Sequence, residues 1–248
     1  MNQTVDLSSI KLTKEQQDVA DLAELGHNVC IFGRAGVGKT TVVEEITKRL
    51  TANGIKVQVL SSSGISCMAY NCGAKTVHAH YGLQTAELPD SLLIERSLRR
   101  QNILENIENT NAVIWDEISM SSERIFSLVN LLQHTVLKNN HPFGGVQIIL
   151  VGDFWQLKPI PGPFDLGKVI YSSELFEKAF KHRFKLTTIW RQGGEELKLK
   201  AALDQIRWDN AMMRQRNISK VYRKNLSRIA LRRASCSYLF QEIACQRS

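Results

Sequence analysis

Residues 28–50, NVCIFGRAGVGKTTVVEEITKRL, decide the fold class of this 248-residue chain. The first five residues are a short apolar run, which is typical of a buried strand. The last ten place aliphatic side chains on one face of a helix, at Val42, Val43, Ile46 and Leu50. Between the two, residues 33–40 match the phosphate-binding pattern G-x-x-x-x-G-K-[ST]. A strand, a glycine-rich turn and a helix in this order predict a P-loop nucleotide-binding fold.

The residue types of this loop indicate how it binds a nucleotide. Glycines let successive backbone N–H groups surround phosphate oxygens, and the helix N-terminus adds the positive end of its dipole. Lys39 can reach the β- and γ-phosphates, and the Thr40 hydroxyl can ligate Mg²⁺. The alternative is a chance glycine-rich turn, which the flanking strand and helix disfavour. We therefore expect ATP and Mg²⁺ to be bound, with the nucleotide held by Gly33, Arg34, Ala35, Gly36, Val37, Gly38, Lys39, Thr40 and Thr41.

Strands and helices alternate around this unit. Further strands are predicted over residues 55–60, 111–115 and 146–151. Helices are expected at about 13–25, 64–70, 90–100, 122–137 and 195–207. The run at 146–151 has no polar interruption, as expected for a strand buried on both faces. The alternation predicts an α/β domain with a parallel sheet flanked by helices.

Two carboxylates, Asp116 and Glu117, follow the strand predicted at 111–115. We expect Asp116 to hold Mg²⁺ through its water shell and Glu117 to polarise the attacking water. The alternative is an acidic first turn of the next helix, where Asp and Glu are common. A nucleoside kinase needs only the metal carboxylate, so the adjacent Glu117 favours nucleotide hydrolysis.

The order of motifs along the chain resembles the petite-integration-frequency (PIF) type of superfamily-one DNA helicase, a relative of the RecD-like helicases. The motifs are LTKEQQDV (12–19), FGRAGVGKT (32–40), VLSSSGISCMAY (59–70), KTVHAHYGL (75–83), VIWDEISM (113–120), GGVQIILVGDFWQLKPI (144–160) and LTTIWRQGGEELKLKAALDQIR (186–207). The resemblance implies one RecA-like domain over residues 1–208. It also implies ATP-dependent, 5′-to-3′ unwinding of single-stranded or forked DNA in replication, repair, recombination and telomere maintenance.

The resemblance implies roles in ATP binding and hydrolysis for three polar residues. Gln16 would read the adenine edge, Gln156 would sense the γ-phosphate, and Arg191 would reach the γ-phosphate and stabilise its developing charge. Without the resemblance, these side chains are interpreted as a solvated helix residue, a polar loop residue and a surface arginine.

The resemblance also implies that five further residues lie along bound DNA. Ser63, Gly64 and His78 would contact the phosphates of a single strand. Phe154 and Trp155 would stack or pack beside them. The alternatives are a core histidine for His78 and a buried hydrophobic residue for Trp155. The segment SSSGISCMAY departs from the Thr-Gly-x-Ala-Ala pattern that is usual in the family.

The charge of the chain is concentrated at one end. Lys and Arg number 32 against 24 Asp and Glu, a formal net charge of +8. Residues 1–208 hold 23 of the basic and 22 of the acidic side chains, so nearly all the excess lies in the basic tail, 209–248. This tail is interpreted either as an amphipathic nucleic-acid-binding helix or as the product of an altered reading frame or retained non-coding sequence. The prediction of DNA binding therefore rests on the motifs and not on net charge.

Two hypotheses about function remain open at this point. Nothing after Arg207 resembles the second RecA-like domain, so the chain is expected to be a first motor domain. It is then either part of a working helicase or a truncated relative that binds ATP, with or without single-stranded DNA, and does not unwind. No apolar run has the length of a membrane span, so no membrane partner is expected. No transit peptide is recognised, which favours the nucleus over mitochondria.

Overall fold

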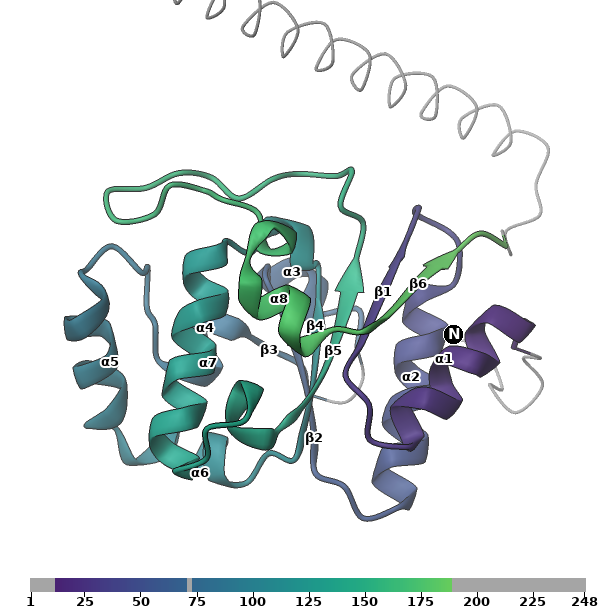
Figure 1. The fold of residues 1–248 in the computed structure, drawn as a ribbon, viewed down its shortest axis with the longest axis horizontal. Helices are drawn as coiled ribbons and strands as arrows, with labels where there is room; N and C mark the ends of the chain where they lie inside the picture. Colours follow the sequence, from purple (N-terminus) through teal and green to yellow (C-terminus); the bar gives the residue numbers. More distant parts are fainter. Residues whose placement is uncertain (1–11, 71–72, 189–248) are drawn as a thin grey trace, which may run out of the picture. The chain divides into compact units, whose positions relative to one another are not determined.

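Six parallel strands form the sheet of the structure, a computed structural model that describes residues 12–70 and 73–188 (Figure 1). The strands are β1 (Val29–Gly33), β2 (Val57–Ser61), β3 (Lys75–Thr76), β4 (Ala112–Asp116), β5 (Gln147–Gly152) and β6 (His182–Leu186). Their order in the sheet is β3-β2-β4-β5-β1-β6, and every neighbouring pair is parallel. The predicted α/β class, a RecA-like domain with a parallel sheet, is confirmed.

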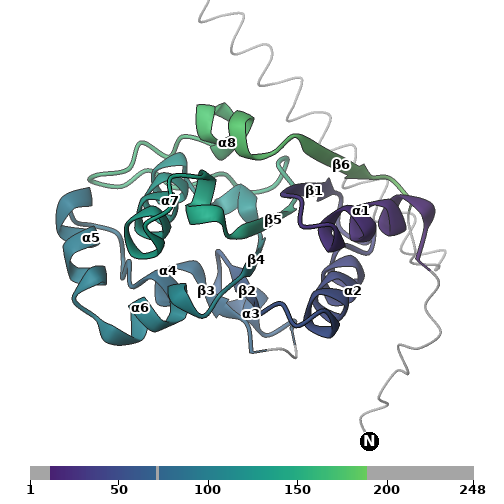
Figure 2. The ribbon, with the colours of Figure 1, turned by 60° about the horizontal axis from the view of Figure 1, so that its bottom comes forward.

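Helices cover both faces of the sheet. They are α1 (Lys14–Glu24), α2 (Lys39–Ala52), α3 (Gly64–Cys67), α4 (Val77–Tyr81), α5 (Asp90–Leu98), α6 (Gln101–Glu108), α7 (Glu123–Leu137) and α8 (Glu174–Ala179). One apolar cluster joins α1 and α2 to alternate residues of the strands, and a second joins α4 to α8 to the residues in between. Figures 1 and 2 show these two groups of helices on either side of the sheet.

Two strands, three helices and one helix boundary differ from the sequence prediction, and the helices that were not predicted are α4, α6 and α8. The two-residue β3 is too short to produce an alternating pattern. The edge strand β6 carries exposed basic side chains between less exposed residues, so it lacks the apolar run used to find the others. The helix expected through Tyr70 ends at Cys67. Arg191, the helix expected at 195–207 and the tail at 209–248 lie outside the described residues.

The carboxyl ends of the parallel strands bring distant motifs to one edge of the sheet. The P-loop follows β1, Asp116 ends β4 and Asp153 follows β5, and these three strands are neighbours in the order β4-β5-β1. Gly152 lets β5 approach the turn after β4, because a Cβ there would lie 2.9 Å from Cγ2 and 3.0 Å from the backbone N of Ile118. In open α/β sheets, ligands bind outside this edge.

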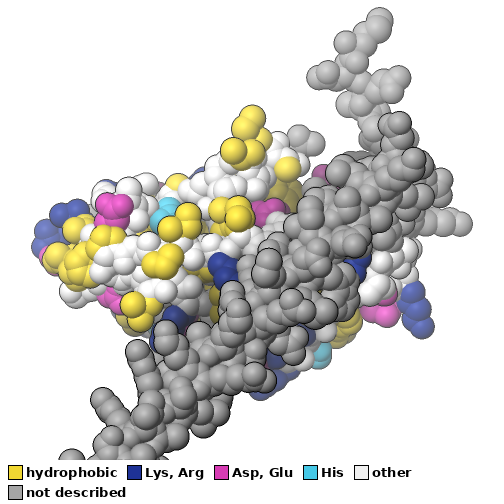
Figure 3. Space-filling model, turned by 90° about the horizontal axis from the view of Figure 1, so that it is seen from above, with side chains coloured by type: hydrophobic (Ala, Val, Ile, Leu, Met, Phe, Trp, Pro, Cys, Tyr) yellow, Lys and Arg dark blue, Asp and Glu magenta, His cyan; other side chains and the backbone are white. Residues whose placement is uncertain are grey.

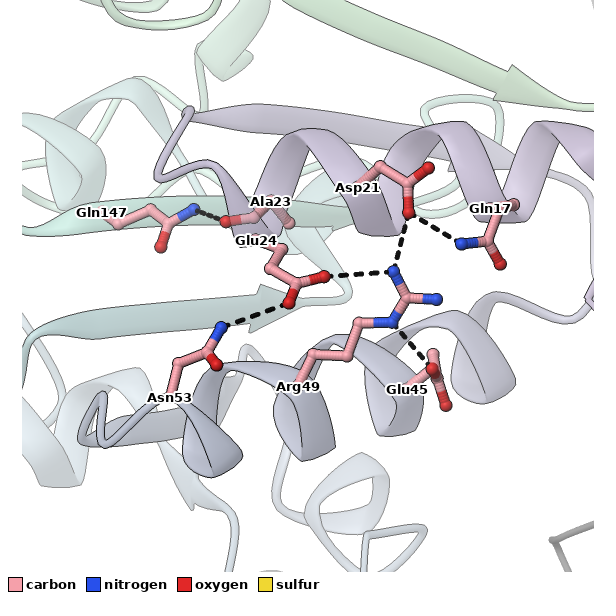
Figure 4. A network of polar contacts seen from close by, with 8 residues as sticks. All are labelled: Gln17, Asp21, Ala23, Glu24, Glu45, Arg49, Asn53 and Gln147. Carbon is pink, nitrogen blue, oxygen red and sulfur yellow. Dashed lines mark hydrogen bonds and ion pairs between the residues drawn. The ribbon is translucent and has the colours of Figure 1, made fainter.

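A polar network fastens α1 to α2 (Figure 4). The Arg49 guanidinium, from α2, pairs with Asp21 at 2.7 Å and Glu24 at 3.3 Å on α1, and with Glu45 at 2.7 Å one turn earlier on α2. The carboxylates are partly exposed, so each pair contributes no more than about 1 kcal/mol. The network holds α1 next to the helix that carries the P-loop.

Candidate nucleotide-binding site

The P-loop has the backbone geometry that phosphate binding requires. Gly36 and Gly38 have φ angles of +83° and +79°, in the left-handed region that favours glycine. Gly33 packs closely, since a Cβ there would lie 2.8 Å from the Val37 side chain. The N-cap of α2 is Gly38, and no side chain caps the helix. An uncapped helix N-terminus of this kind is a common site for anion binding.

Lys39 is held within the loop. Its Nζ donates to the backbone oxygens of Gly33 at 2.9 Å and Arg34 at 3.1 Å. Its charge also lowers the pKa of Glu117 across the site, against the effects that raise it. The ammonium group is thus placed between the loop that would receive phosphates and the carboxylates that follow β4.

Gln16 is buried against the P-loop. The side chain is 2% exposed, so the interpretation as a solvated helix residue is wrong. Its Oε1 accepts from the Thr13 N–H at 2.9 Å in a capping box, and its Nε2 donates to the Val37 oxygen at 3.3 Å. Gln16 therefore connects the start of α1 to the P-loop, and its reading of adenine stays a prediction.

Asp116 ends β4 with its carboxylate held from one side. Its Oδ2 accepts a hydrogen bond from the Tyr70 hydroxyl at 2.6 Å, and the residue is 9% exposed. Burial and the Asp116 charge raise the pKa of Tyr70, so this hydroxyl is protonated and donates. The Asp116 backbone oxygen also accepts from Ser62 N at 3.3 Å. The segment after β2 therefore contacts the predicted metal-binding residue twice.

The carboxyl group of Glu117 has a pKa above its usual range. Burial raises the pKa of its carboxyl, and the charges of Asp116 and Asp153 raise it further. A raised carboxyl pKa makes the group a better proton acceptor near neutral pH. The residue has a φ of +53°, which is uncommon for any residue except glycine and is often found at functional sites.

Asp153 is a site residue that the sequence analysis did not select. It is 3% exposed, its Oδ1 accepts from the Trp155 N–H at 3.2 Å, and its charge acts on Glu117. The sequence did contain a signal for it, namely an acidic residue at the end of an apolar strand. Asp153 follows β5 in the same way that Asp116 ends β4. Tyr70 gave no comparable signal, since its partner lies 46 positions away.

The donor set fits Mg²⁺ that is bound together with a nucleotide. Magnesium keeps several waters and is usually held by one or two carboxylates plus substrate phosphates. Thr40, in the first turn of α2, and Asp116, at the end of β4, supply a hydroxyl and a carboxylate. Within residues 12–70 and 73–188, no group of three or more His, Cys, Asp or Glu is arranged to hold a metal ion.

The GDFWQL segment after β5 turns sharply and points its residues in different directions. Phe154 lies against Phe32 and Tyr171, with ring centroids 6.0 Å and 5.1 Å away, which supports packing for this residue. Trp155 is 63% exposed, so the alternative of a buried hydrophobic residue is wrong. Gln156 is exposed, and its backbone N–H donates to the Asp153 oxygen at 2.9 Å. Its contact with a γ-phosphate stays a prediction.

The residues predicted along DNA lie after β2 and on α4. Ser63 caps α3 by accepting from Ser66 N at 3.3 Å, and Gly64 is exposed. His78 is half-buried, and burial lowers its pKa. His78 and Ser62 line a groove of about 390 Å³, together with residues 85–87, 120–122, 125 and 157–165.

Apolar side chains are exposed at the same edge of the sheet. Figure 3, which looks onto the carboxyl ends of the strands, shows several of them at the surface. Those of the loop after β5 are Trp155, Leu157, Ile160, Phe164 and Leu166.

None of the helices that the structure describes combines the length and apolar content that a membrane span requires.

Known proteins share these motifs. A profile of the family described as "PIF1-like helicase" matches residues 11–217. The "ATP-dependent DNA helicase PIF1" of Saccharomyces cerevisiae (strain YJM789) is 34% identical over 191 residues, which cover 75% of this chain and 22% of that protein.

Solved structures agree with the sequence match. The Pif1 helicase from Candida albicans has a TM-score of 0.72 and 28% identity, covering 80% of this chain and 44% of that one. A Bacteroides Pif1 helicase in complex with ADP-AlF3 and ssDNA has a TM-score of 0.63 and 27% identity, covering 80% and 47%. The chain thus spans less than half of each of these relatives.

Proposed function

Because this chain belongs to the PIF1-like helicase family, we propose that residues 12–188 form an ATP-hydrolysing motor domain that acts on DNA. The observation that carries the proposal is the meeting of two separate segments at one sheet edge. The P-loop after β1, Asp116 at the end of β4 and Glu117 next to it supply a phosphate cradle, a metal carboxylate and a base. These are the parts that phosphoryl transfer to water requires.

The chemistry assigned to each residue follows from its position. The P-loop N–H groups and the Lys39 ammonium bind the β- and γ-phosphates and orient the γ-phosphorus. Glu117 accepts a proton as the water oxygen bonds to that phosphorus and the bond to the β–γ bridging oxygen breaks, which leaves ADP and phosphate. Thr40 and Asp116 would hold Mg²⁺, which would supply positive charge against the negative charge that develops on the phosphates.

DNA is proposed to bind at the groove beside this site. Ser62 and His78 line it, and Ser63 and Gly64 lie on the same segment. The support is the position of this segment, which also contacts Asp116. The structure of a Bacteroides relative is described as a complex with ADP-AlF3 and ssDNA, which supports the proposal that this chain binds both a nucleotide and single-stranded DNA.

The finer parts of the proposal rest on family resemblance. They are 5′-to-3′ polarity, single-stranded or forked DNA as the substrate, roles in genome maintenance including telomeres, and a nuclear location. Duplexes with a single-stranded tail on either the 5′ or the 3′ side test the polarity. The proposal expects unwinding of the 5′-tailed duplex alone, and equal unwinding of both contradicts it.

The central experiment is an ATPase assay of the purified chain with and without single-stranded DNA. Hydrolysis that is stimulated by DNA and lost in Lys39→Ala supports the motor domain. The second candidate is a nucleotide-binding relative without turnover. It is supported when the chain binds ATP but hydrolyses it no faster than Lys39→Ala does.

A further inference from the structure

A tyrosine outside the predicted catalytic set contacts the predicted metal site. Tyr70 Oη lies 2.6 Å from Asp116 Oδ2. Thr40 is close enough to this hydroxyl to act on the pKa of Tyr70, which it lowers against the effects that raise it. The Tyr70 hydroxyl therefore binds one of the residues expected to hold Mg²⁺ and lies near the other, although Thr40, Tyr70 and Asp116 come from three different segments of the chain.

The Tyr70 ring has little freedom to move. The residue is 6% exposed and belongs to the apolar cluster on the α1–α2 side of the sheet, which includes Val59, Ala112 and Ile114. The hydroxyl is kept protonated by burial and by the neighbouring carboxylate, which raise the pKa of Tyr70. A fixed donor directed at Oδ2 restricts the rotation of the Asp116 carboxylate.

We propose that Tyr70 is a positioning residue for Mg²⁺-dependent nucleotide binding, acting through the carboxylate of Asp116. The inference rests on the proposed function, because it assumes that Thr40 and Asp116 hold the metal. Hydrogen bonds to metal-binding carboxylates orient the ligand oxygen, and their loss typically weakens metal binding by 10- to 100-fold. Tyr70→Phe removes only the hydroxyl and keeps the ring in the core.

Tyr81 provides a matched control. It is also buried, at 0% exposed, and its hydroxyl accepts a hydrogen bond from Gln133 Nε2 at 3.0 Å. Tyr81 lies in the apolar cluster on the opposite face of the sheet from Tyr70. Tyr81→Phe therefore removes a buried, hydrogen-bonded hydroxyl without touching the nucleotide site.

The test is binding of a fluorescent ADP analogue to the full chain, titrated with Mg²⁺, for the wild type, Tyr70→Phe and Tyr81→Phe. We expect Tyr70→Phe to raise the half-saturating Mg²⁺ concentration by about ten-fold. Its affinity for the analogue without Mg²⁺ stays that of the wild type, because the P-loop is unchanged. Tyr81→Phe changes neither quantity. Tyr70→His has a shorter side chain that does not bring its ring N–H to the Asp116 carboxylate, and we expect the same rise as in Tyr70→Phe.

Two results overturn the role of Tyr70 alone. The first is an unchanged or lower half-saturating Mg²⁺ concentration in Tyr70→Phe. The second is an equal rise in Tyr81→Phe, which makes the effect one of general stability. If Tyr70→Phe does not fold, which its circular dichroism shows, Tyr70→His carries the test, and an unchanged half-saturating Mg²⁺ concentration there contradicts the proposal. If the wild type binds the analogue without any dependence on Mg²⁺, the proposed function fails, and the role of Tyr70 fails with it.

Discussion

His80 makes the stability of this fold depend on pH. The side chain is 1% exposed, and neither ring nitrogen has a hydrogen-bond partner among the residues that the structure describes. Burial lowers the pKa of His80 from 6.5 to about 4, and the charge of Lys75 contributes to the shift. The folded protein therefore keeps the imidazole neutral over a pH range in which the unfolded chain protonates it.

The sign and size of the effect follow from this difference. A pKa that is lower in the folded state means that the unfolded state binds more protons between pH 6.5 and about 4. The stability contribution is complete above pH 6.5 and is lost as the pH falls. At about 1.4 kcal/mol for each pKa unit, the loss is about 2 kcal/mol at about pH 5 and about 3 kcal/mol near pH 4.

The variant that tests this is His80→Leu, with stability measured by urea unfolding from about pH 7.5 to about pH 5. At each pH we compare the free energy of unfolding of the variant with that of the wild type. We expect this difference to shift in favour of the variant by about 2 kcal/mol between the neutral and the acidic end. The lost edge contact with the Tyr81 ring, at 4.7 Å, is independent of pH and cancels in this comparison.

A histidine on the surface serves as the control. His141 is exposed, and we expect His141→Leu to keep the pH dependence of the wild type. Curves for His80→Leu and the wild type that run parallel across this range would refute the reasoning, because the imidazole would then titrate alike in the folded and unfolded states.

Three further predictions concern the site and its frame. Glu117→Gln keeps ATP binding and lowers hydrolysis by about 10²- to 10⁴-fold, seen as single-turnover phosphate release, and a smaller loss argues against Glu117 as the base. Gly152→Ala, whose Cβ would press on Ile118, lowers the free energy of unfolding by about 1–3 kcal/mol in urea and slows hydrolysis; wild-type values contradict the close approach. Arg49→Met removes three ion pairs and lowers the free energy of unfolding by about 1 kcal/mol at low salt. We expect a smaller loss at high salt, and a loss that does not depend on salt assigns the effect to packing.

The parts that depend on local pattern were predictable from the sequence. The P-loop, its strand and its helix follow from glycine spacing and apolar periodicity. β2, β4 and β5 appear as apolar runs within two residues of their observed bounds. Asp116 and Glu117 stand out because two acids directly follow such a run. β6 escaped detection, because an edge strand with exposed basic residues has no continuous apolar pattern.

Contacts across the fold were not predictable in this way. The hydroxyl of Tyr70 on Asp116, the charge of Asp153 near Glu117 and the burial of Gln16 under the P-loop each join residues far apart in sequence. Periodicity shows which face of a helix or strand is buried, but it does not show which polar atom meets which across a sheet.

The sequence by itself therefore determined the fold class, the nucleotide chemistry and the acids available for it. These follow from rules that act over a few residues, such as glycine φ angles, strand runs and helical faces. Only the tertiary structure decided which oxygen of Asp116 is occupied and why the pKa of Glu117 is raised. The physical reason is that burial and electrostatic fields are set by neighbours in space, which the order of parallel strands brings to one edge.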